Sequence, residues 1–115
     1  MMNNNNIVNT NMRGIPYIST TNVTVSDNSV NFALGYRQIE PAGFFVVRLT
    51  NAIPDGTTGT LPITLSLSGV TRSLTFFGGA SVTAADITGT GVLLVFNDKF
   101  NGILQLIQNA PTSNG

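Results

Sequence analysis

The chain has 115 residues with five basic and five acidic side chains, so its formal net charge is zero and only 9% of its residues are charged. Because these charges are scattered, the sequence lacks the basic patch of a nucleic-acid-binding protein and the basic amphipathic helix of a peripheral membrane protein. With 42% hydrophobic residues, the chain suits one folded domain, which we place at residues 16–109. We therefore expect neither nucleic acid nor membrane among its partners.

The first 15 residues are expected to form an extended, asparagine-rich arm outside the folded domain. Four consecutive residues, Asn3, Asn4, Asn5 and Asn6, cannot contribute to an apolar core. The two interpretations are a floppy terminus and a clamp that lies along a neighbouring chain, for which these asparagines are the candidate contacts. The segment also lacks the basic and apolar regions of a signal peptide, which predicts a protein made and kept in a cytoplasm unless it leaves inside a larger particle.

From residue 16 onward, short β-strands are predicted at close intervals with turn residues between them. Thr83 and Asp86 have the spacing of a capping box around one helical turn at 84–86. The predicted strands are 17–25, 30–36, 44–50, 61–68, 70–77, 91–96 and 103–108, with a C-terminal coil at 110–115. The expected fold is all-β, with about seven short antiparallel strands in a sandwich or small barrel of immunoglobulin-like or jelly-roll-like type.

Three of the predicted strands are apolar on both faces, in the stretches FFVV, VLLVF and ILQLI. A chain of this length has too little protein to cover three such strands twice, so their second faces are predicted interfaces between chains, in a homo-oligomer or with another protein. Arg48 and Arg72 each end an apolar strand face. Such an arginine either extends its side chain to water or belongs to an interface, where arginine is enriched.

The stretch LPITLSLSG, residues 61–69, alternates between apolar and small polar side chains. Its second face carries no Lys, Glu or Arg, which a strand in contact with bulk water usually has. Small hydroxyl groups let a neighbouring chain approach closely and lose less hydration free energy than charged groups on burial. Thr64, Ser66 and Ser68 are therefore predicted to contact another protein chain.

The residues that catalysis or metal binding needs are scarce in this sequence. It contains no histidine and no cysteine, which removes the commonest general base and the thiolate nucleophile. The segment NDKFNG resembles a calcium loop, but Lys99 in its middle would repel a cation, so a hairpin loop is expected there. We expect no enzyme activity, no metal and no cofactor. Carbohydrate binding is the rival class, although the chain has no tryptophan and two tyrosines, so a glycan partner lacks support from the residues.

The stretches ALGYRQI, GTLPITL, GGASVTAADITGTGVLLVF and NGILQL, within residues 30–107, resemble small virion-associated proteins of tailed gut phages, particularly the crAss-like group. The resemblance implies a structural role at the capsid surface of a virion, as an auxiliary or decoration protein or as the head-binding module of a fibre. The implied partners are the major capsid protein or other virion proteins. A fibre would continue into a long shaft, so we expect the auxiliary protein, with an adhesin-type or carbohydrate-binding β-sandwich as the alternative.

Overall fold

The computed structural model describes residues 15–35 and 42–109, which form seven strands and one short 3-10 helix. The elements are β1 (Tyr17–Val25), β2 (Val30–Leu34), β3 (Gly43–Leu49), β4 (Ile63–Leu67), β5 (Val70–Phe77), η1 (Ala84–Asp86), β6 (Gly91–Asp98) and β7 (Ile103–Asn109). The predicted boundaries are confirmed residue for residue for β1, β5 and η1, and the other predicted strands overlap the observed ones. Residues 1–14 of the predicted asparagine-rich arm, Tyr36 and the coil at 110–115 lie outside the described residues.

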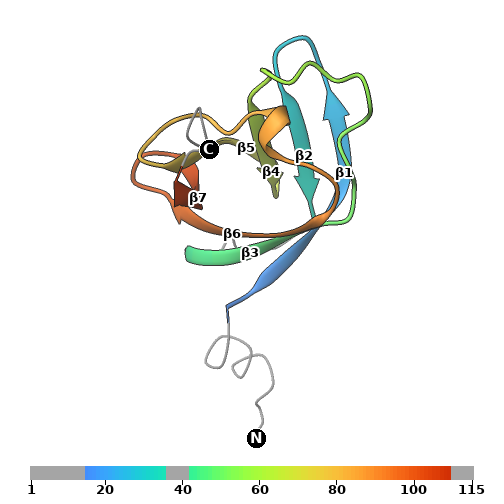
Figure 1. The fold of residues 1–115 in the computed structure, drawn as a ribbon. Helices are drawn as coiled ribbons and strands as arrows, with labels where there is room; N and C mark the ends of the chain where they lie inside the picture. Colours follow the sequence, from blue (N-terminus) through green and yellow to red (C-terminus); the bar gives the residue numbers. More distant parts are fainter. Residues whose placement is uncertain (1–14, 36–41, 110–115) are drawn as a thin grey trace, which may run out of the picture.

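The strands close into a barrel in the order β1-β2-β4-β5-β7-β6-β3 (Figure 1). Three antiparallel hairpins, β1–β2, β4–β5 and β6–β7, supply six of the strands. The hairpins meet along two parallel pairs, β2–β4 and β5–β7. The remaining strand, β3, closes the ring by pairing antiparallel with β6 and parallel with β1.

This arrangement confirms the all-β expectation and corrects the expectation of antiparallel strands. Three of the seven strand pairs are parallel, so the fold is a mixed barrel and departs from the antiparallel immunoglobulin-like and jelly-roll-like types. The physical reason lies in the connections. Each parallel pair is separated in the chain by one intervening strand, which provides the long crossover that parallel pairing requires.

The core fills the inside of the barrel with the apolar residues of the period-two pattern. β2 and β4 alternate strictly between buried and half-buried positions, so every second residue points inward. Each large apolar side chain that is fully buried contributes about 1.5–3 kcal/mol of hydrophobic stabilisation. The largest fully buried side chains are Phe32, Phe45, Phe76, Ile63, Leu65, Leu74, Leu104, Val30, Val47, Val82 and Val95.

The connection after β5 is part of the barrel wall, because β5 separates from β4 halfway along its length. The amide of Val82 donates to the Leu74 carbonyl at 3.0 Å, and the Ile63 amide donates to the Val82 carbonyl at 2.8 Å. Asp86 Oδ2 then accepts from the Thr83 amide at 2.9 Å, so the predicted capping box is confirmed. The segment 80–83 thus fills the gap between the two strands.

Candidate interaction surfaces

The outward side of β3 and β6 is apolar and exposed. Phe44 is paired with Phe96 and Val46 with Leu94 across the two strands, so these four side chains lie on one outward-facing surface. Phe44 is 48% exposed, and its ring meets that of Phe96 edge to face with the centroids 5.1 Å apart. The intervening residues of both strands fill the core, so both strands are apolar on both sides, as their sequences predict.

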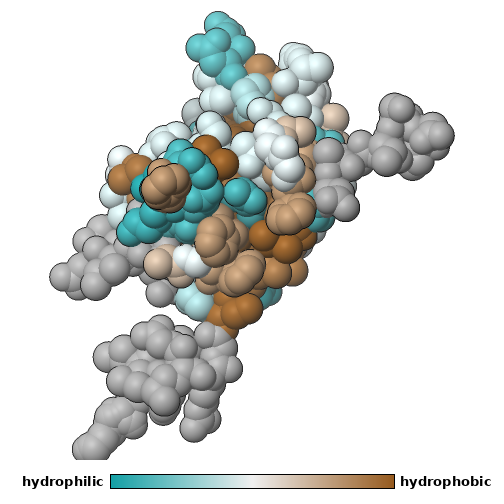
Figure 2. Space-filling view, turned by 90° about the vertical axis from the view of Figure 1, so that its left-hand side faces the viewer, coloured by the Kyte–Doolittle hydropathy of each residue, from teal (hydrophilic) through white to brown (hydrophobic). Residues whose placement is uncertain are grey.

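This surface continues onto β1 through the parallel β1–β3 pair. Tyr17 is the Cα partner of Val46 and is 62% exposed, and Val92 on β6 is 66% exposed. Ile15, Tyr17, Val46, Arg48 and Val92 line a shallow hollow of about 230 Å³. Figure 2 shows hydrophobic residues gathered in the lower part of that view, at the height of β3 and β6 in Figure 1.

We call this surface the β3–β6 face. It consists of Ile15, Tyr17, Phe44, Val46, Arg48, Val92, Leu94, Phe96 and Asp98. Sequence reasoning found the apolar β3 and β6 members because both sides of these strands are apolar, and it named Arg48, but it placed Asp98 in the hairpin loop. It missed Ile15 and Tyr17, whose only signal is that Tyr17 directly precedes another apolar residue, Ile18, at the start of a strand.

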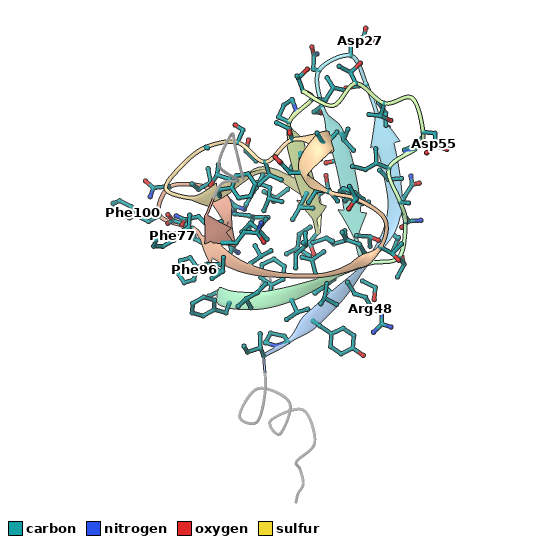
Figure 3. The ribbon with its side chains drawn as sticks, viewed as in Figure 1. Asp27, Arg48, Asp55, Phe77, Phe96 and Phe100 are labelled. Carbon is teal, nitrogen blue, oxygen red and sulfur yellow. The ribbon has the colours of Figure 1, made fainter. Side chains whose placement is uncertain are left out.

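Two charged side chains stand on the β3–β6 face, one near each end. Arg48 is paired with Val92 across β3 and β6. Asp98 lies six residues after Val92 on β6, so at roughly 3.3 Å per residue it is about 20 Å from Val92 along the strand. Arg48 is exposed and makes no hydrogen bond or ion pair with another described residue. Figure 3 shows Arg48 and Phe96 toward opposite ends of the strand pair. The face is therefore an apolar strip with opposite charges at its two ends.

Asp98 is held in place by the β6–β7 turn. Its Oδ1 accepts from the Asn101 amide at 3.2 Å, and its Oδ2 accepts from Asn101 Nδ2 at 2.8 Å and from Gln105 Nε2 at 3.4 Å. The hydrogen bond from the Asn101 side chain is the main cause that lowers the pKa of the Asp98 carboxyl below its ordinary value of 3.8. At neutral pH, Asp98 is thus a fixed negative charge. At the tip of the same turn, Phe100 is 95% exposed, and the predicted hairpin loop is confirmed.

Thr64 and Ser66 lie on a different side of the barrel, where their hydroxyl groups join a hydrogen-bonded ladder. Thr64 Oγ1 donates to Asn31 Oδ1 at 2.7 Å and Ser66 Oγ donates to the same oxygen at 3.1 Å. The Ser66 and Thr71 hydroxyl oxygens are 2.7 Å apart. We call Asn31, Thr64, Ser66 and Thr71 the β2–β4 face. Its polar groups bond to one another across three strands, which leaves a surface without formal charge.

The other two predicted interface residues do not belong to either face. Ser68 sits in the tight turn between β4 and β5, with a φ of 53°, because the strand ends at Leu67. Arg72 is half-buried on the inward side of β5, level with Leu65, and its guanidinium lies beside Gly102 of the β6–β7 turn. The candidate residues Arg48, Thr64 and Ser66 therefore point outward, whereas Arg72 belongs to one end of the barrel.

The described residues offer few groups for chemistry. Within 15–35 and 42–109, no three acidic, histidine or cysteine side chains come together as metal ligands would. A hollow of about 280 Å³ between 53–59 and 84–89 presents one carboxylate, Asp55, among small residues such as Gly59 and Ala85. Acid–base catalysis would need a second positioned group there. In the part of the chain that the structure describes, no helix is long and apolar enough to span a membrane.

The chain was compared with protein-family models, with curated proteins and with solved structures, and no match was found in any of them. The function must therefore be inferred from the residues and their geometry. Three features are available for that inference: the β3–β6 face, the β2–β4 face and the exposed tip of the β6–β7 hairpin.

Proposed function

We propose that the chain is a structural, non-catalytic subunit of a phage virion, an auxiliary or decoration protein at the capsid surface that is made in the host cytoplasm. The observation that carries the proposal is the β3–β6 face. Monomeric proteins seldom expose a contiguous apolar patch larger than a few hundred Å², and such patches mark interaction sites. A role based on contacts between chains gives this face a partner and needs no catalytic group.

Composition supports the same interpretation. A freely soluble domain usually carries many charged side chains, which limit association, whereas only 9% of the residues here are charged. A subunit that spends its life packed in a particle needs little surface charge. The resemblance of residues 30–107 to small virion-associated proteins of tailed gut phages indicates that this particle is a phage virion.

The β2–β4 face suits docking onto the capsid. Asn31 and the hydroxyl groups of Thr64, Ser66 and Thr71 are already hydrogen-bonded to one another, so a partner that covers them displaces little tightly held water. Each contact of this kind is weak. When many identical copies dock on a repeating lattice, the partner chains of the lattice hold them through many such contacts at once.

Quantitative mass spectrometry of purified virions, from a phage whose genome encodes this sequence, tests the proposal directly. A capsid auxiliary protein is expected in a fixed ratio to the major capsid protein, unchanged by density-gradient purification. Host proteins of similar size and abundance in the lysate provide the control for contamination. If the protein is abundant in the lysate and absent from the purified particles, the proposed function is wrong.

Glycan binding by a head-fibre module is the second candidate, and the tip of the β6–β7 hairpin is the observation that favours it. Phe100 is 95% exposed beside the carboxylate of Asp98 and the amide of Asn101, a combination of ring and polar groups that suits sugar recognition. A glycan array with the wild-type chain and the Phe100→Ala variant tests this candidate. Binding that is lost in the variant would support it, and an array without any signal would exclude it.

A further inference from the structure

We propose that the β3–β6 face binds the same face of a second copy, with the strands of the two copies antiparallel across a two-fold axis. This inference rests on the proposed structural role, because it names the partner of the surface that carries that role. A second copy is the partner that the distribution of charge on the face fits best. Two-fold symmetry is also the commonest way in which identical chains associate.

The argument begins with the charges. The outward positions of β3 and β6 hold one cation, Arg48, at one end and one anion, Asp98, at the other. Every other outward side chain on these two strands is apolar. The Asp98 carboxylate accepts hydrogen bonds from Asn101 in the turn and from Gln105 on β7. Because the Asp98 side chain is only half-buried, a guanidinium group from another chain can still approach its oxygens.

Symmetry then selects one arrangement. If the two-fold axis lies in the interface and runs across the strands, the Arg48 end of each copy meets the Asp98 end of the other, which forms two ion pairs. If the axis runs along the strands, the two Arg48 side chains face each other and like charges repel. In the favoured arrangement, the row of Tyr17, Val46 and Leu94 packs on the partner's row of Phe44 and Phe96. Sheets packed in this way lie about 10 Å apart, which an arginine side chain can span.

The size of the face is compatible with a dimer. An aromatic side chain carries roughly 200 Å² of surface, so Tyr17 at 62% and Phe44 at 48% exposure each leave about 100 Å² open. With Ile15, Val92 and Leu94, the exposed apolar area is on the order of 500 Å², and a polar rim brings it near the roughly 800 Å² per partner of a stable interface. Each copy would cover the apolar surface of the other.

Light scattering of the purified full-length chain over a dilution series is the first test. We expect a mass twice the 12.1 kDa of one chain. In the Arg48→Glu variant, an acidic residue at position 48 faces Asp98 of the other copy at both ends of the interface. In the Asp98→Lys variant, a basic residue faces Arg48 in the same way. Because like charges repel, each variant should raise the dimer dissociation constant by about 100-fold or more. Thr24→Glu changes the charge of an exposed residue on the polar side of the barrel and should leave the constant unchanged.

An equimolar mixture of the Arg48→Glu and Asp98→Lys variants is the decisive experiment. In a heterodimer of the two, the glutamate introduced into one chain faces the lysine introduced into the other, and the original Arg48 and Asp98 form the second pair. We therefore expect the mixture to dimerise although each variant alone does not. Circular dichroism shows whether each variant is folded. Should Asp98→Lys fail to fold, Leu94→Arg, which puts a charge into the middle of the face, replaces it and should abolish the dimer.

Several outcomes would overturn the inference: a wild-type monomer at all concentrations, a trimer, dimers unaffected by Arg48→Glu, or a mixture of folded variants that stays monomeric. These results are separable from a failure of the proposed function. A monomer that is still incorporated into virions contradicts only the contact between copies. A dimer that is absent from virions contradicts only the structural role.

Discussion

The turn between β4 and β5 gives the sharpest test of the backbone geometry. Ser68 and Gly69 have φ values of 53° and 87°, and Leu67 is paired with Val70 across them. Two positive φ values in a two-residue hairpin loop indicate a type I′ turn, for which Asn-Gly is the favoured sequence. Serine in this region is strained by roughly 1 kcal/mol, and asparagine tolerates it better. We therefore expect Ser68→Asn to raise the free energy of unfolding by about 0.5–1 kcal/mol.

Chemical denaturation at fixed protein concentration measures this difference, and a calorimetric melting temperature about 2–5 °C higher would agree with it for a domain of this size. The denaturant slope should stay the same, because the turn changes no buried surface. Ser68→Val is the opposing variant. A β-branched residue is poorly tolerated at positive φ, so this variant should lose stability. If Ser68→Asn is no more stable than the wild type, or if the two variants behave alike, the type I′ geometry is wrong.

Three further predictions concern the turn at Asp98, the core and the β2–β4 face. The lowered pKa of Asp98 means that its carboxylate stabilises the fold at neutral pH, and that this contribution is lost as the pH falls through the folded-state pKa. The melting temperature of Asp98→Asn should therefore lie below that of the wild type at pH 7. In a pH series, the difference between the two melting temperatures should disappear below about pH 4. Phe45→Ala, at a fully buried position, should cost about 3–5 kcal/mol in denaturant unfolding, whereas Phe44→Ala on the neighbouring outward position should cost about 1 kcal/mol; equal losses would contradict the assignment of inner and outer sides. Thr64→Glu should weaken incorporation into virions, measured by mass spectrometry against Thr58→Glu, which changes an exposed residue of the loop between β3 and β4. Full occupancy of Thr64→Glu would show that the β2–β4 face does not contact the capsid.

The positions of the strands could be predicted from the sequence because each strand has a local signal. The alternation in residues 17–25 and 70–77 and the capping pair Thr83 and Asp86 depend only on near neighbours. The pairing of the strands could not be predicted in the same way. A period of two tells which side of a strand is apolar, but it does not tell which strand lies beside it, and the three parallel pairs follow from contacts between distant parts of the chain.

The same distinction explains which surface residues the sequence could and could not reveal. The local pattern places Arg48 on the same side of its strand as Phe44 and Val46, because the three residues are two positions apart. The structure shows that this side faces outward. Tyr17 joins this surface only through the pairing of β1 with β3, which no local pattern encodes. The alternation of the sequence assigns Ser68 to the same strand face as Thr64 and Ser66. In the structure the turn consists of both Ser68 and Gly69, so the Ser68 side chain does not lie on that face.

The place of β3 in the barrel has a consequence for the order in which the chain folds. The three hairpins join strands that are close in sequence, and such hairpins form within about 1–10 μs. β3 has no neighbour of this kind, since its pairs join distant positions, such as Leu49 with Gly91. Contacts between distant positions slow folding to the millisecond-to-second range in all-β proteins. We expect insertion of β3 to be the late step, so that the surface we assign to a second copy is assembled only when the rest of the barrel is complete.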